Sequence, residues 1–492
     1  MKVSKITLPD FTDDENALLN RLWQQLADCQ PNNLLRASYY DGKRAIKKVG
    51  EIIPRQYYRL GLVLGWSGKA VDVLARQCNL DGFVWPGEDL ESLGYQEVWD
   101  DNFFGSESSS AIISSLIHGP AFLINTEGGD DEPKSLIHVK DALNATGDWN
   151  PRTRRLDNLL SVIAWDEDLR PRELALYLRN RTAVAKKDGG RWEVQWREHT
   201  LGVPAEALVY KPRVGRPFGS SRISRPVMSI HDRALRELIR TEGHADVFSY
   251  PELWMLGADT SIFKNPDGSL KPSWKVMLGR IKGIPDDDKA IDPKNARADI
   301  KQFMAASPQP HIDLLQQCAN EFAGETHLPV SALGVQARTN TTTADGSDNA
   351  EKQLTAEAEG ATDDWSPALR RSMMRALAIK NDMSEVPAAL RSLDSKWRNP
   401  AYISRSAQAD AGLKQLSAVP WLAETEVGLE LLGLSKRDID RALAQRDSAK
   451  RSTQVSSLVD KLTGGGAAIA DPAPGTAEQA AQQAIGNGLR GL

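Results

Sequence analysis

The 492-residue sequence has little cysteine, no long apolar run and no surplus of basic charge. Its three cysteines, Cys29, Cys78 and Cys318, include no CxxC pair, and this sparse, odd set indicates reduced thiols and an intracellular place of folding. No apolar stretch approaches the ~20 residues of a membrane span, and the N-terminal segment lacks an apolar run of signal-peptide length. The net charge of −5 excludes a general nucleic-acid coat but is compatible with an acidic channel along which DNA slides.

Enzyme motifs are missing as well. The sequence contains no HExxH, no GxSxG and no Cys/His metal spacing. The segment at 65–70, GWSGKA, superficially resembles a phosphate loop, but Val63 occupies the first glycine position and Ala70 replaces the magnesium-binding hydroxyl residue. The acidic triplet 286–288 is interpreted as a solvated turn rather than a cation site. We therefore predict no catalytic, cofactor-binding or metal-binding residue, and no cofactor.

Helical periodicity dominates the first 118 residues. A helix is predicted over 9–30, with Leu18, Leu19, Leu22 and Leu26 on one face. A second is predicted over 68–78, and one or two more over 91–118. Between them, 81–83 (DGF) is interpreted as a tight turn that leads into a short strand.

The period changes between 120 and 212. Short runs rich in Val, Ile, Tyr and Trp alternate there with turn residues, which predicts an antiparallel, β-rich lobe. Trp192 and Trp196 alternate on one face of a predicted strand, so we expect core or interface packing for them.

A long amphipathic helix is predicted over 224–249. Pro226 lies in its first turn, where a missing N–H costs nothing. Charged residues are expected on its other faces, namely Arg233, Arg236, Glu237 and Arg240. The apolar stripe predicted for packing consists of Val227, Ile230, Ala234 and Leu238.

A second amphipathic helix is predicted over 310–324, and it ends before Leu328-Pro329. Its apolar stripe consists of Ile312, Leu315, Ala319 and Phe322. A helix, an excursion and a returning helix suit a projecting stalk, although two surface helices of a globular core are the alternative. If the stripe packs sideways in a ring, Phe322→Asp should prevent ring closure and leave the β-rich lobe folded.

The excursion between the two helices is polar. Residues 261–306 contain nine basic and six acidic side chains, against a net −5 for the whole chain. A solvated loop is one interpretation, and a docking surface for another protein is the other. The basic residues proposed for docking are Lys271, Lys275, Arg280 and Lys282.

Helical patterns return after a polar loop at 336–347. Asp348 and Glu351 resemble a capping box that opens a new helix. An apolar face follows at a four-residue spacing in Trp365, Leu369, Met373 and Leu377, and Ser366-Pro367 is expected to break or restart the helix.

From residue 400 onward the pattern is helical, with Ser435 as a predicted N-cap. The segment after Gly464 has hardly any core formers, which predicts disorder. Deleting 464–492 should therefore leave assembly intact.

Two long segments, 219–259 and 305–335, resemble the signature of tailed-bacteriophage portal proteins of the siphophage type. Shorter segments agree with the same family: YYDGK at 39–43, KAVDVLARQCNLDGF at 69–83, GVPAEALVYKPR at 202–213 and WRNPAYISRSAQADAGLKQ at 397–415. The resemblance extends in order over about residues 15–450. It departs from the family after Val335, where TNTTTADGSDNAEKQL replaces a Pro-Ser-Ser-Ala type of sequence.

The resemblance implies an α+β portal fold with a β-rich wing, a helical stem, a small α/β clip and a helical crown. The implied boundaries are 1–223 for the wing, 224–249 and 307–335 for the stem helices, 250–306 for the clip, 336–350 for the tunnel-loop region, 351–396 for a long wing helix, 397–462 for the crown and 463–492 for a disordered tail. The loop facing DNA would include Thr339, Asn340, Thr341, Thr342 and Thr343.

The resemblance also implies a ring, usually of twelve subunits, at one vertex of the viral head. Its expected partners are further copies of the chain, the major capsid protein, a scaffolding protein, the terminase large subunit, a head-tail connector and double-stranded DNA that passes without sequence preference. We expect it in the virion, assembled in the host cytoplasm, without membrane contact. Another virion ring adaptor or minor head protein, and a head-associated enzyme, are the alternatives.

Overall fold

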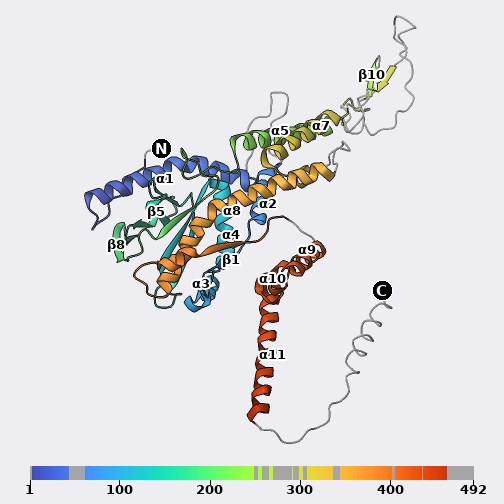
Figure 1. Cartoon of the computed structure of the whole chain (residues 1–492). Coiled ribbons are helices and arrows are strands. Elements are labelled where there is room, and N and C mark those ends of the chain that lie inside the picture. The colour runs from blue at the N-terminus through green and yellow to red at the C-terminus, as the bar shows by residue number, and fades with distance from the viewer. Residues whose placement is uncertain are drawn as a thin grey trace, which may run out of the picture. The chain divides into compact units, whose positions relative to one another are not determined.

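The computed structural model divides the chain into two compact units, Met1–Ala401 and Tyr402–Leu492 (Figure 1). The first unit combines helices with strands, whereas the described part of the second contains helices. The structure describes residues 3–43, 61–248, 253–256, 265–269, 291, 299–302, 307–335, 344–401, 405–434 and 436–462.

The first unit begins with helices, continues with strands and ends with the longest helices. Its described α-helices are α1 (Asp13–Tyr40), α2 (Trp66–Gln77), α3 (Tyr95–Asp101), α4 (Phe104–His118), α5 (Arg225–Phe248), α7 (Gln309–Thr326) and α8 (Ala344–Lys380). Its described strands are β1 (Leu80–Val84), β2 (Pro120–Glu127), β3 (Ser135–Asp141), β4 (Ala145–Asn150), β5 (Arg155–Trp165), β6 (Pro171–Leu178), β7 (Arg181–Asp188), β8 (Arg191–Glu198), β9 (Ala205–Val209), β10 (Leu253–Leu256), β11 (Asp299–Gln302) and β12 (Asp394–Trp397).

Eight strands between Pro120 and Val209 confirm the predicted antiparallel, β-rich lobe. They form a three-stranded sheet of order β3-β2-β9 and a five-stranded meander of order β4-β5-β6-β7-β8. Trp192 and Trp196 lie on β8 and pack against a buried cluster, as predicted. The β-rich lobe, together with helices α1 to α4 and α8, is called the wing below.

The wing is layered because side chains alternate across each strand. On β2, Leu123 faces the helical core that contains α4 and α8. The next residue, Ile124, faces the five-stranded sheet. Leu176 on β6 points away from that interface and packs on Leu22 of α1. The order of the layers is therefore α4 with α8, the three-stranded sheet, the five-stranded sheet and the first half of α1.

Helix α1 is longer than the sequence predicts. It begins after a capping box, in which Glu15 N donates to Thr12 Oγ1 at 3.3 Å and Thr12 N donates to Glu15 Oε2 at 2.8 Å. The predicted apolar face is confirmed, since Leu19, Leu22 and Leu26 are buried. The helix continues through Pro31 to Tyr40 because its last turns also reach the core, where Tyr39 is buried.

Helix α8 corrects two predictions. It begins at Ala344, so Asp348 lies inside it and does not cap it. It also runs without a break through Pro367. A proline in a helix interior costs ~3 kcal/mol. Trp365 and Leu369, on either side of the proline, are fully buried and each contributes ~1.5–3 kcal/mol or more. Burial of the predicted apolar face therefore outweighs the local preference.

The DGF segment at 81–83 is not a turn that precedes a strand, because it lies within β1. A register shift between Leu80 and Gly82 accommodates Gly82, whose φ is 151°. Strand β1 pairs with β12, which the sequence analysis did not predict. The pairing joins the early helices to the segment that follows α8.

The second unit is helical over its described residues, as predicted. Its α-helices are α9 (Arg405–Ala418), α10 (Glu426–Leu431) and α11 (Lys436–Leu462). Ser435, the predicted N-cap of the last helix, and the tail 463–492 lie outside the described residues. Helices α9 and α10 approach closely at Gly412, where an added Cβ would lie 2.4 Å from the Leu431 carbonyl oxygen.

Candidate functional site: the stem helices and their anchor

Helices α5 and α7 form an antiparallel pair, called the stem hairpin below (Figure 1). Near the start of α5, Ser224 Oγ donates to Glu325 Oε1 at 3.4 Å. Near its end, Glu237 Oε2 lies 3.5 Å from His311 Nδ1. The contacting residues in α7 have lower numbers as those in α5 have higher numbers, so the two helices run antiparallel. This confirms the two predicted helices and their antiparallel arrangement.

The centre of the hairpin is held by Arg233 of α5. Its guanidinium forms an ion pair with Glu321 of α7, and its Nε donates to Cys318 Sγ at 3.2 Å. The hydrogen bond and the ion pair raise the pKa of Arg233 above its ordinary value. Arg233 was predicted on a face outside the apolar stripe, and it lies at the edge of the contact between the helices, where its side chain is 42% exposed.

The apolar stripe predicted for α5 is partly displaced. Val227 and Ala234 are fully buried, whereas Ile230 and Leu238 are half-buried. Four buried positions of α5 lie outside the predicted stripe: His231, Leu235, Glu237 and Ile239. Glu237, predicted on a polar face, is only 3% exposed because Arg240 and His311 enclose its carboxylate. Helix α5 therefore packs over a wider arc than a single stripe provides.

The stripe predicted for α7 separates into two groups. Ala319 and Phe322 are completely buried, and Phe322 packs against Trp66 of α2 with ring centroids 5.5 Å apart. Leu315 is half-buried and Ile312 is 43% exposed. A charge at Phe322 would thus disrupt the core of the subunit, so Phe322→Asp cannot separate ring closure from folding as proposed from the sequence. Ile312 suits that test better.

A buried ion cluster fixes the base of the hairpin to the wing, and we call it the anchor. Arg222, just before α5, forms an ion pair with Glu357 of α8, with Nη1 2.6 Å from Oε2. The same arginine donates from Nη2 to the Thr326 carbonyl at the end of α7, at 2.6 Å, and from Nε to the Ala70 carbonyl of α2, at 2.5 Å. One side chain therefore joins four segments.

Glu357 is the centre of the anchor. Its Oε1 accepts hydrogen bonds of 2.5 Å from Tyr210 and from Lys211, and His327 lies 3.2 Å from its Oε2. Burial alone would raise the pKa of Glu357, but the charge of Arg222 and the hydrogen bonds from Arg222, Lys211 and Tyr210 hold it at about 2. The carboxylate is therefore ionised at neutral pH.

A second contact holds the first half of α5. His231 Nδ1 lies 2.8 Å from Ser67 Oγ of α2, and the Tyr39 ring meets the His231 ring edge-on at 5.1 Å between centroids. Tyr39 also donates from its hydroxyl to Asp232 at 2.9 Å. Ser67 therefore helps to hold α5 against α2. The GWSGKA segment begins helix α2 at Trp66 and does not form a phosphate loop.

Several predicted site residues cannot be placed. The channel-loop residues 339–343 and the docking residues Lys271, Lys275, Arg280 and Lys282 lie outside the described residues, as does the triplet 286–288. The described part of the excursion includes β10 and β11, which pair antiparallel with Leu253 opposite Gln302.

The described residues offer no metal-binding group of three or more His, Cys, Asp or Glu side chains. Within the same residues, no helix is long and apolar enough to cross a membrane. The contacts of Arg222 with Glu357, with the Thr326 carbonyl and with the Ala70 carbonyl join the stem hairpin to the wing.

A family model described as "Phage portal protein, SPP1 Gp6-like" matches residues 19–448. The chain belongs to this phage portal protein family. The match begins within α1 and includes the stem hairpin, the anchor and about half of the second unit. Portal proteins are structural components of the phage particle and not enzymes, so the family does not favour the adaptor or enzyme alternatives.

Curated relatives agree with the family. The chain is 23% identical over 411 residues to the portal protein of Mycobacterium phage L5, covering 82% of each sequence. It is 24% identical over 433 residues to the portal protein of Mycobacterium phage D29, covering 86% of this chain and 85% of the relative. The family and the fold class predicted from the sequence are confirmed.

Solved structures of gene transfer agent (GTA) particles are also similar. A chain from the neck of the empty GTA particle, computed with C6 symmetry, matches 78% of this portal chain and 94% of its own, with 12% identity and a TM-score of 0.41. A chain from the virion of the native particle matches 75% and 90%, with 14% identity and a TM-score of 0.37.

Proposed function

We propose that this portal chain forms a closed ring, usually of twelve subunits, at one vertex of the phage head, with an axial channel for DNA packaging and ejection. Its membership of the portal family carries this proposal. The stem hairpin supports it, because a pair of helices anchored rigidly on the wing can line a channel without changing its diameter under load.

Exposed apolar groups on α7 support lateral packing between subunits. Ile312 and Leu314 are each 43% exposed in the isolated chain, whereas Ala319, Phe322 and Ala323 on the same helix are buried. A ring of identical subunits uses heterologous contacts that close into a cycle. We expect both side chains to become buried against a neighbouring stem hairpin.

The remaining elements are assigned by their place in the chain. Residues 250–306 serve as the clip that meets the terminase large subunit during packaging and the head-tail connector afterwards. The basic residues predicted for docking lie there. We assign the tunnel-loop region, which faces DNA in the channel, to 336–350 and the crown inside the head to 397–462. Scaffolding protein and major capsid protein contact the ring during assembly in the host cytoplasm.

Electron microscopy of the purified full chain tests the proposed ring directly. Negative-stain images should show rings with a central hole, and native mass spectrometry should give twelve or thirteen subunits. A monomer that stays monomeric when scaffolding protein is added would contradict the proposal. Cleavage of DNA by the pure protein with Mg²⁺ would point instead to the enzyme alternative.

A further inference from the structure

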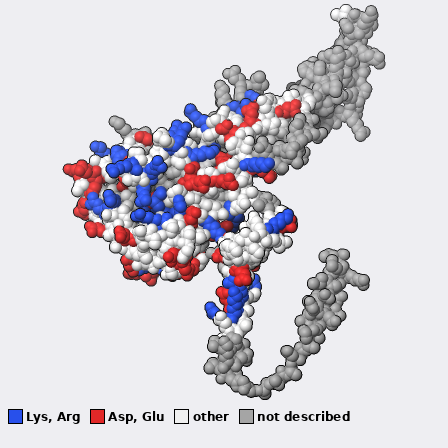
Figure 2. All heavy atoms as spheres, in the orientation of Figure 1, with Lys and Arg blue, Asp and Glu red and all other residues white. Residues whose placement is uncertain are grey.

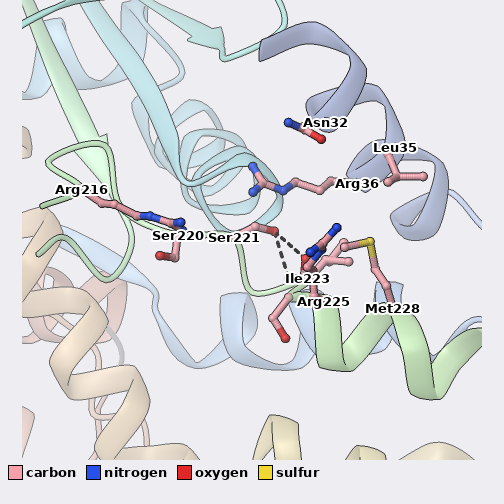
Figure 3. Close-up of a pocket in the computed structure, with 10 residues that line it drawn as sticks. Asn32, Leu35, Arg36, Arg216, Ser220, Ser221, Ile223, Arg225 and Met228 are labelled. Carbon is pink, nitrogen blue, oxygen red and sulfur yellow. Dashed lines mark hydrogen bonds between the residues drawn. The ribbon is translucent and has the colours of Figure 1, made fainter. Parts of the chain in front are cut away.

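A cavity of about 580 Å³ lies between the last turns of α1 and the start of α5 (Figure 3). Arginines from three segments line it: Arg36 from α1, Arg216 from the loop after β9 and Arg225 from the first turn of α5. Arg36 and Arg216 extend toward one another across the cavity (Figure 3). We call this cavity the arginine pocket.

The positive charge of the arginine pocket has no counter-charge within the described residues. None of their carboxylates lies within 4.0 Å of the guanidinium groups of Arg36, Arg216 or Arg225. Arg36 donates to the His118 carbonyl at 2.8 Å. This hydrogen bond positions the guanidinium but does not neutralise its charge. Burial, with a further contribution from Arg216, lowers the pKa of Arg36 below its ordinary value. An anionic ligand would relieve this repulsion.

Guanidinium groups bind both carboxylates and phosphates. DNA phosphate suits this pocket poorly in a portal, because three converging arginines would hold a phosphate in place, whereas DNA has to slide past. Fixed carboxylates on a protein surface suit it better. The required partner surface therefore carries closely spaced carboxylates without cations of their own.

Helix α8 provides such a surface. Glu359 and Asp363 are exposed, lie one helical turn apart and have no ion pair within the described residues. Figure 2 shows both acidic and basic side chains on the visible face of the first unit. We call Glu359 and Asp363 the acidic edge.

The arginine pocket and the acidic edge of one subunit face away from each other. Ser221 lines the pocket, while the adjacent Arg222 turns to the opposite side and contacts Glu357 on α8. Residues advance by ~100° around a helix, so Glu359 projects roughly opposite to Glu357 and away from the pocket. A subunit cannot satisfy its own pocket with its own acidic edge.

We propose that the arginine pocket of one subunit receives the acidic edge of the next copy of this chain. Two complementary surfaces that face opposite ways on one subunit generate a head-to-tail cycle, which is the contact that a ring requires. This inference rests on the proposed ring and names the surfaces through which it closes.

Charge reversal on the full chain tests the contact. Arg216→Glu with Arg225→Glu reverses the pocket, and both side chains are exposed and outside the anchor. Glu359→Lys with Asp363→Lys reverses the acidic edge. Each double variant alone should lose rings in native mass spectrometry, with association at least ~10-fold weaker, because like charges then face one another. Arg152→Glu with Arg154→Glu, in the exposed β4–β5 turn, is the matched control and should keep its rings.

Mixing the two double variants should restore association, because every contact in an alternating ring is again between opposite charges. A chain that carries all four substitutions should also form rings. Normal rings from either double variant, or no recovery on mixing and in the fourfold variant, would overturn the proposal.

The test also separates this inference from the proposed ring. If the wild-type chain forms no rings even with scaffolding protein, the proposed function is contradicted. Heterodimers between the two double variants would still support the contact, and their absence would overturn it. Loss of DNA binding by the pocket variant with unchanged rings would assign the pocket to phosphate and also overturn it.

Discussion

Arg222 and Glu357 form a buried ion pair, 2.6 Å between Nη1 and Oε2, at the junction of the stem hairpin and the wing. Their side chains are 3% and 7% exposed. Residues 135 positions apart in the sequence thereby fix the start of α5, the end of α7 and the middle of α8 in one arrangement. A shift of the hairpin relative to the wing would have to break this pair.

Glu357→Ala should destabilise the first unit by ~3–5 kcal/mol, because it leaves the buried guanidinium of Arg222 without a counter-charge. Denaturant unfolding of the full chain, followed by tryptophan fluorescence, measures the change. Glu359→Ala, two residues away and exposed, is the matched control and should change stability by less than ~0.5 kcal/mol. Equal effects of the two substitutions would contradict the anchor.

The anchor also predicts a pH dependence. The folded pKa of Glu357 is about 2, below the ordinary value of 4.5. A depressed carboxyl pKa contributes stability that is complete above the ordinary value and is lost as pH falls from 4.5 toward 2. The stability gap between wild type and Glu357→Gln should therefore shrink by ~3 kcal/mol over that interval. A gap that stays constant with pH would show that Glu357 is not held ionised by the anchor.

Phe322 and Ile312, three turns apart on α7, should respond oppositely to substitution. Phe322→Ala removes a fully buried ring beside Trp66 and should cost ~3–5 kcal/mol of stability. Ile312→Asp changes an exposed side chain and should leave unfolding of the monomer nearly unchanged while weakening ring formation. Urea unfolding and native mass spectrometry measure the two effects. Intact rings from Ile312→Asp would remove α7 from the subunit contact.

The ion pair between Arg233 and Glu321 should contribute little to stability. Both side chains are about 40% exposed, at 42% and 39%, so solvent screens their attraction. A double-mutant cycle with alanine at both positions should give a coupling of ~0.2–1 kcal/mol that decreases with added salt. A salt-independent coupling well above that range would mean that the pair is shielded from water.

Gly412→Ala should destabilise the second unit. The added Cβ would lie 2.4 Å from the Leu431 carbonyl oxygen, so α9 and α10 would have to separate. Overpacking of this kind costs ~1–3 kcal/mol. Hydrogen exchange should become faster in α9 to α11 and stay unchanged in the β-sheets of the first unit. Ala411→Ser, at an exposed neighbouring position, should leave both patterns as they are.

Local patterns predicted the β-rich lobe, the two stem helices and the buried face of α8, because alternation and helical periodicity depend on neighbouring residues. They failed at Asp348 and Pro367, where the local signals for a helix start and a helix break were overridden by burial of Trp365 and Leu369. Glu237 was misplaced for a related reason, since Arg240 and His311 satisfy a carboxylate that composition alone would leave in water.

The sequence by itself determined the order and type of most of the longer elements, the absence of enzyme motifs and the resemblance to portal proteins, since all three depend on residue identity and spacing along the chain. The tertiary structure decided which side chains join segments that are distant in the sequence. Arg222, Glu357 and the arginine pocket gave no local signal, because an ion pair or a shared cavity between distant segments exists only once the chain has folded. Burial gives these groups their roles. In low-dielectric surroundings a paired charge is costly to separate from its partner, and an unpaired charge is stabilised when an oppositely charged group binds.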